Sequence, residues 1–95
     1  MDIVRVNTNK TRDPSGMWDA DPNNAAKCDY LVEERHGKVH AVYEFTGVSK
    51  RNSQGRFSFK GLKNITSTQP GQYIKENLDV SRVPGESNPV QYDTI

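Results

Sequence analysis

The sequence has little of what would place it in several large classes of protein. Its 95 residues include a single cysteine, Cys28, so it cannot form an internal disulfide or a zinc site built from several cysteines. It has no apolar run of about 18 residues, and Met1-Asp2-Ile3 does not begin a signal peptide. We therefore expect a cytoplasmic protein with no membrane partner, in which Cys28 is a small buried residue.

Hydrophobic residues are also scarce, at 33% of the chain. The length favours one domain over residues 1–95, because two halves would each be too small to bury a core of their own. The net charge of +1 is too low to keep the chain unfolded, so we expect a small folded domain. Because its core would be lean, a homo-oligomer is one way in which it could bury more surface.

Acidic residues are absent from one third of the chain. Residues 46–75 contain no Asp or Glu, whereas the remainder holds all 12 acidic residues. The basic residues of this segment are Lys50, Arg51, Arg56, Lys60, Lys63 and Lys75. Such uneven charge is typical of an anion-binding face, but a solvated basic hairpin would have the same composition.

The chain consists mainly of short β-type segments. Alternating or β-branched runs predict strands at residues 3–6, 30–34, 39–45, 56–60, 62–65 and 90–92. A helix start at Asp21-Pro22 and a helix over residues 72–78, after a Pro70-Gly71 turn, complete the prediction. We expect a mainly β (α+β) domain, a small and mostly antiparallel β-barrel with one or two short helices, because closure hides exposed strand edges.

Polar segments and alternation predict the loops and the core. Loops are expected at residues 7–16, 35–38, 47–55 and 81–89. Residues 39, 41, 43 and 45 would share the buried face of their strand, with Val42 on a half-exposed opposite face. Phe57 and Phe59 would belong to the core, with Arg56 and Lys60 on the other side of the same strand.

The order of motifs resembles that of a known family. Trp18 precedes a short helix that ends in Ala25-Ala26-Lys27 and is followed by Asp29-Tyr30-Leu31-Val32; further motifs lie at residues 37–45, 56–61 and 88–92. This succession resembles the PUA-like β-barrels and their EVE-type branch. It is also similar to an uncharacterised domain found alone or attached to GIY-YIG-type endonucleases. The resemblance implies a PUA-like domain that binds nucleic acid, with a pocket for a modified base.

Such a pocket needs an aromatic plane, polar groups for the base edge and cations for the phosphates. Trp18, the only tryptophan, would supply the plane, although it could instead anchor the core. Asn7 and Asn88 would hydrogen-bond the ligand or, alternatively, brace turns. Arg56 and Lys60 would hold phosphates, unless their strand face is only solvated. We predict that these five residues bind the ligand.

Signals for catalysis are weak. His36 and His40 are four residues apart, but they lie on either side of Gly37 and lack further ligand residues. Glutamates on neighbouring strands, such as Glu33 and Glu44, could form a carboxylate pair, but no nucleophile or phosphate-binding loop accompanies them. We therefore expect no enzyme activity, no metal and no cofactor.

The first hypothesis is a non-catalytic module that binds a nucleotide, or a base (modified or not) in nucleic acid. In a phage or bacterium, such a small protein could sequester a free nucleotide signal and so act against a defence system. The alternative from another class is a protein-interaction module that docks an acidic partner through residues 46–75. Salt dependence would separate these hypotheses, because binding to a polyanion weakens steeply with salt.

Overall fold

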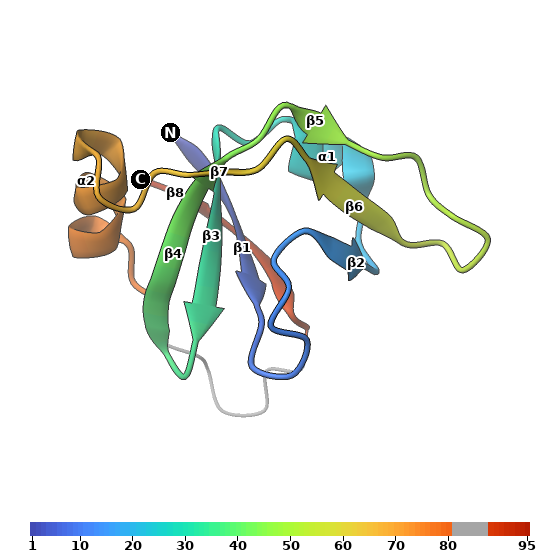
Figure 1. The fold of residues 1–95 in the computed structure, drawn as a ribbon, viewed down its shortest axis with the longest axis horizontal. Helices are drawn as coiled ribbons and strands as arrows, with labels where there is room; N and C mark the ends of the chain where they lie inside the picture. The colour runs from blue at the N-terminus through green and yellow to red at the C-terminus, as the bar shows by residue number, and fades with distance from the viewer. Residues whose placement is uncertain (81–87) are drawn as a thin grey trace.

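The computed structural model describes residues 1–80 and 88–95, and the predicted mainly β fold with two short helices is confirmed (Figure 1). The strands are β1 (Asp2–Asn7), β2 (Gly16–Trp18), β3 (Tyr30–Arg35), β4 (Lys38–Glu44), β5 (Gly47–Val48), β6 (Phe57–Lys60), β7 (Lys63–Asn64) and β8 (Val90–Thr94). The helices are α1 (Pro22–Ala26) and α2 (Gln69–Asn77). The described strands form a five-stranded sheet, in the order β7-β4-β3-β1-β8, and a three-stranded sheet, in the order β2-β6-β5.

Both sheets are open, so the described strands do not form the closed barrel that the sequence predicted. The larger sheet has β7 and β8 at its edges. Ile3 and Val4 are both buried, and so are Leu31 and Val32. Because successive residues of a strand point to opposite faces, the larger sheet is covered on both sides. A small closed barrel buries only its inner face, which is why this buried pattern belongs to a layered fold.

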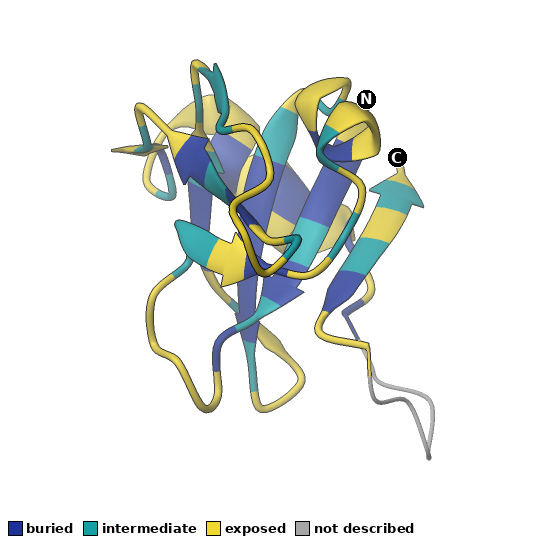
Figure 2. Ribbon diagram, turned by 90° about the vertical axis from the view of Figure 1, so that its right-hand side faces the viewer, coloured by how far each residue is buried: buried dark blue, intermediate teal, exposed yellow. Residues whose placement is uncertain are grey.

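A hydrophobic cluster lies on each face of the larger sheet, and the buried residues are concentrated in its central strands (Figure 2). One cluster, between the two sheets, comprises Val4, Val6, Trp18, Ala25, Leu31, Phe57, Phe59 and Val90. The other, under α2, comprises Ile3, Val32, Val42, Ile65, Ile74, Leu78 and Val80. The predicted core positions of Phe57 and Phe59 are therefore confirmed. The predicted half-exposure of Val42 is wrong, because α2 covers that face and leaves Val42 0% exposed.

The centre of the larger sheet is a parallel pair. β1 and β3 run side by side from Ile3 opposite Tyr30 to Asn7 opposite Glu34. The crossover between them contains β2 and α1, whereas the other described pairings are antiparallel. Two neighbouring parallel strands have their carboxyl ends on the same side of the sheet. The 8–15 loop that follows β1 therefore lies beside the turn that follows β3 (Figure 1).

The start of α1 agrees with the prediction, but α2 begins earlier than predicted. Asp21 caps α1, and its side chain accepts a hydrogen bond from the Asn23 N–H. Thr68 caps α2, and Pro70 lies in its first turn. Backbone N–H groups in the first turn have no partner within the helix, so proline loses no hydrogen bond there. The predicted Pro70-Gly71 turn is therefore wrong. Gly71 lies inside the helix, where an added Cβ would overlap the backbone of residues 65 and 66.

Gly71→Ala is expected to lower the free energy of unfolding by about 1–3 kcal/mol, because the added methyl overpacks the contact between α2 and the preceding loop. Gly47→Ala is the matched control, since its added Cβ would meet no atom within 4 Å. That variant is expected to be neutral or slightly stabilising. Urea denaturation followed by circular dichroism measures both, and equal stabilities would show that α2 tolerates displacement.

Two short strands occur at or beside predicted loops. β2 begins at the last residue of the predicted 7–16 loop and β5 lies within the predicted 47–55 loop; both pair with β6. Two or three residues are too few to carry a periodic pattern. The predicted 81–89 loop falls largely outside the described residues. Within the described part of the chain, no helix has the length and apolar character needed to cross a membrane.

Candidate anion-binding site

The hairpin between β3 and β4 turns through His36 and Gly37, as the predicted 35–38 loop requires. Their φ values, 52° and 77°, are both positive, which is the backbone of the tight turn that best fits a twisted hairpin. Arg35 and Lys38 are paired across this turn. The turn therefore places two cations and an imidazole at one end of the larger sheet.

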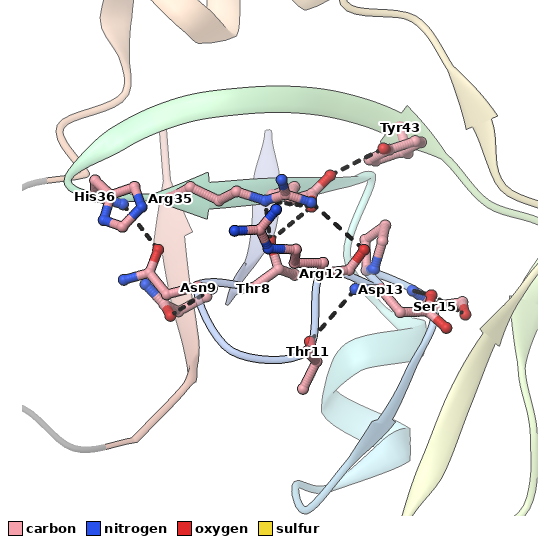
Figure 3. A network of polar contacts seen from close by, with 12 residues as sticks. Thr8, Asn9, Thr11, Arg12, Asp13, Ser15, Arg35, His36 and Tyr43 are labelled. Atoms are coloured by element: carbon pink, nitrogen blue, oxygen red, sulfur yellow. Dashed lines mark hydrogen bonds and ion pairs between the residues drawn. The ribbon is translucent and has the colours of Figure 1, made fainter.

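Glu34 and Asn9 fasten this turn to the end of β1. The Asn7 side-chain amide donates to Glu34 Oε1 at 2.9 Å, and the Gly37 N–H donates to Glu34 Oε2 at 2.9 Å. The His36 N–H donates to Asn9 Oδ1 at 3.0 Å (Figure 3). These bonds join the 8–15 loop and the hairpin turn into one surface.

A buried carboxylate lies behind this surface. Glu33 is 1% exposed and accepts hydrogen bonds from Thr8 Oγ1 at 2.6 Å, Arg35 Nη2 at 2.6 Å and the Tyr43 hydroxyl at 3.0 Å. Arg35 Nε also donates to Thr8 Oγ1 at 2.8 Å (Figure 3). A buried charge is tolerated when it is paired and fully hydrogen-bonded. The network therefore holds the Arg35 side chain in one position at the end of β3.

The protonation of Glu33 and Tyr43 follows from the same contacts. Burial acts to raise the pKa of Glu33, but hydrogen bonds from Thr8, Arg35 and Tyr43 outweigh it and hold the pKa below its ordinary value. Burial, with the hydrogen bond to the Glu33 carboxylate, raises the pKa of Tyr43 to about 12. Neither group is poised to exchange a proton near neutral pH, as a general acid or base would be.

Arg35 reaches the surface at a basic hollow of about 520 Å³, termed here the hairpin hollow. Its lining residues are Asn9, Arg12, Arg35, His36, Lys38, Val39 and His40. None of these described lining residues is acidic, and three of them carry a formal positive charge. The volume lies in the range of small-molecule sites. A concave surface with charge of one sign concentrates ions of the opposite sign.

Arg12 reaches the hairpin hollow from the 8–15 loop. Its N–H donates to the Thr8 carbonyl at 3.0 Å, and its own carbonyl accepts from Arg35 Nη2 at 3.4 Å. This contact joins residues that are 23 positions apart in the chain (Figure 3). Two guanidinium groups from distant segments therefore line one hollow.

Trp18 is a core residue. It is 3% exposed within the cluster between the sheets, and its indole N–H donates to the Pro14 carbonyl at 2.9 Å. A ring so covered offers no free face to a base. The structure therefore gives Trp18 the alternative role of core anchor, and the expected stacking plane is not available there.

Asn7 and Asn88 brace loops. The Asn7 side-chain N–H donates a hydrogen bond to Glu34, as described above, and Asn7 Oδ1 accepts one from the Asn9 N–H at 3.2 Å. Asn88 Oδ1 accepts from the Val90 N–H at 3.0 Å. The two lie near each other, because the Asn7 N–H donates to the Pro89 carbonyl at 2.8 Å. Neither residue lines the hairpin hollow.

The basic segment 46–75 is divided among several elements. Lys50, Arg51 and Arg56 lie between β5 and β6, Lys60 ends β6, Lys63 begins β7, and Lys75 lies in α2; all six are exposed. The β5–β6 hairpin and α2 lie at opposite ends of the molecule (Figure 1). The segment therefore does not form one anion-binding face, although Arg56, just before β6, and Lys60, at its end, remain exposed.

Sequence reasoning missed Arg12, Arg35 and Lys38 as a group. They come together only because β1 and β3 are parallel, which places the loops that follow them side by side. The available signal was the Arg-His-Gly-Lys turn, which predicts two cations at the tip of a tight hairpin. His36 and His40 are exposed and also line the hollow.

Two further kinds of reactive group in the described residues are the cysteine and the potential metal ligands. Cys28 is only partly buried, so the prediction that it is a buried residue is wrong. This partial burial, followed by the nearby charges of Asp2 and Asp29, raises the pKa of Cys28 to about 11, so the residue is a thiol rather than a thiolate at neutral pH. Across residues 1–80 and 88–95, no three His, Cys, Asp or Glu side chains gather closely enough to hold a metal ion. Comparisons of the chain with protein-family models, curated proteins and solved structures found no match.

Proposed function

We propose that the domain is a non-catalytic module that binds the phosphates of a nucleotide or of nucleic acid in the hairpin hollow. The observation that carries this proposal is the convergence of Arg12, Arg35 and Lys38 on a hollow whose described lining holds no acid. Guanidinium groups match phosphate geometry through paired N–H donors. Arg35 is already held by Glu33, so less side-chain freedom is lost on binding than for an unrestrained cation.

The exposed imidazoles support a base beside the phosphates. His36 and His40 line the hairpin hollow, and histidine rings can stack on unpaired bases. These rings would supply the aromatic plane for base stacking that was expected from Trp18. The resemblance to PUA-like and EVE-type domains favours the same ligand class, although the described strands form open sheets.

Arg12→Ala and Lys38→Ala are each expected to weaken binding of a fluorescent oligonucleotide about tenfold, because each removes a charge-assisted contact of about 1.5 kcal/mol. Each should also reduce the slope of log affinity against log salt by about 0.7–0.9, the effect of one phosphate contact. Fluorescence anisotropy titrations between about 50 and 200 mM salt measure both quantities.

The matched control is Lys27→Ala, which removes the same charge from an exposed position at the end of α1, outside the hollow. Its affinity and salt slope should equal those of the wild type. An equal loss in the control would mean that net charge, and not the hollow, governs binding. Failure of the wild-type protein to bind any nucleotide or oligonucleotide would contradict the proposal.

The exposed cations between β5 and β6 favour a second candidate, docking of an acidic protein partner. Figure 1 shows this hairpin extending beyond the larger sheet. If nucleic acid is the ligand there, Arg56→Ala and Lys60→Ala will reduce affinity and flatten its salt dependence. A protein-docking face would leave nucleotide binding unchanged in both variants. A protein that sequesters a free nucleotide would instead bind mononucleotides with little salt dependence.

A further inference from the structure

A second hollow adjoins the hairpin hollow. It has a volume of about 460 Å³, lies between the hairpin turn and the end of α2, and is termed here the helix hollow. Lys38 and Val39 line both hollows. The helix hollow adds Lys75, an exposed cation in the last turn of α2, together with one acidic residue, Asp79. Lys75 therefore extends the row of positive charges from the hairpin hollow past the hairpin toward α2.

The two hollows meet at the edge of the larger sheet. In the part of the chain that the structure describes, β7 pairs only with Tyr43 and Glu44, which leaves residues 38–41 at an open edge of β4. Lys38 and His40 are exposed on this edge. The Glu33 and Arg35 network lies at the end of the cluster between the sheets, whereas Val39 packs on the cluster under α2. A path from Arg12 to Lys75 therefore crosses from one face of the sheet to the other.

We infer that the ligand is a single-stranded nucleic acid whose backbone crosses this edge and places successive phosphates at Arg12, Lys38 and Lys75. This inference rests on the proposed function and extends it from one anion to a chain. A mononucleotide would fill only one hollow. The persistence length of a DNA duplex is about 50 nm, so a duplex does not follow the sharp edge of a small domain, whereas a flexible single strand can.

The test compares thymidine monophosphate, oligothymidylates of increasing length and a duplex of matched length. Affinity should rise with length until the strand spans both hollows. The salt slope for the long single strand should be about −2, which corresponds to three phosphate contacts at about 0.7 each. Lys75→Ala should weaken binding of the long strand about tenfold and reduce its slope by about 0.7, while the affinity for the monophosphate stays unchanged.

Lys75→Gln provides a second variant, which removes the charge but keeps a long polar side chain, and Lys27→Ala is again the charge-matched control. Circular dichroism melting curves report whether each variant is folded. If Lys75→Ala binds the long strand like the wild type while Arg12→Ala weakens every ligand, the inference is overturned and the proposed function stands. Duplex binding as tight as single-strand binding would also overturn it. Absence of binding for all the probes would overturn the proposed function as well.

Discussion

Trp18→Ala is expected to lower the free energy of unfolding by about 3–5 kcal/mol, as large-to-small substitutions of buried aromatics do. The indole lies in the cluster between the two sheets, and its N–H bond to the Pro14 carbonyl ties the 8–15 loop to β2. A domain of this size has a total stability on the order of 5–14 kcal/mol, so the variant would retain only part of it. Urea denaturation measures the change.

The control is Met17→Ala, one residue earlier on β2. Met17 is 43% exposed, and its sulfur accepts a 3.2 Å hydrogen bond from Ser58 Oγ. Substitution at such a surface position should change stability by about 0.5 kcal/mol or less. A loss below about 1 kcal/mol for Trp18→Ala would show that this ring does not hold the two sheets together.

Glu33→Gln is expected to destabilise the domain by about 3–5 kcal/mol, because it leaves Arg35 without the buried carboxylate that pairs with it. Glutamine has only one acceptor oxygen, so it cannot keep all the hydrogen bonds that Thr8, Arg35 and Tyr43 donate to the two oxygens of Glu33. Glu44→Gln removes the same charge from an exposed position on β4 and should have little effect. Equal stability of the two variants would contradict the structural role of the network.

The Glu33 network also predicts how stability depends on pH. The pKa of Glu33 in the folded state lies below its ordinary value of 4.5, so folding favours the ionised carboxylate. Its contribution is fully present above pH 4.5 and is lost as the pH falls through the lower, folded-state pKa. The difference in stability between wild type and Glu33→Gln should therefore shrink below pH 4.5. A difference that stays constant down to strong acid would exclude this linkage.

The local parts of the fold were predictable because each has a short-range cause. The strands around residues 30–34 and 39–45 follow from hydrophobic pattern, and the hairpin between them follows from His36-Gly37. The helix cap at Asp21 has a strong side-chain signature. α2 was placed too late because Pro70-Gly71 reads as a turn, whereas proline is also favoured at the start of a helix.

The candidate site was not predictable by such rules, because its causes are long-range. Trp18 lies in a polar stretch of sequence, and its burial depends on pairing with β6, about 40 residues later. Arg12 and Lys38 line one hollow only because β1 and β3 pair in parallel across an intervening strand and helix. The charge pattern predicted an anion-binding face at residues 46–75. In the structure the cations of that segment lie on several elements, whereas Arg12, Arg35 and Lys38 line one hollow.

The outer edge of β4 at residues 38–41, which no other described strand covers, has a consequence for how the molecule behaves at high concentration. Residues 38–41 present backbone donors and acceptors that a strand from a second molecule could use, which is the usual route to edge-to-edge aggregation. The register shift opposite Glu33 and Glu34 makes His40 an extra residue in the strand, and the exposed Lys38 adds charge beside it. Irregular backbone and charge are two devices that keep such an edge from recruiting another chain. Lys38, which is proposed to hold a phosphate, would thus also hinder this edge from pairing with a second molecule.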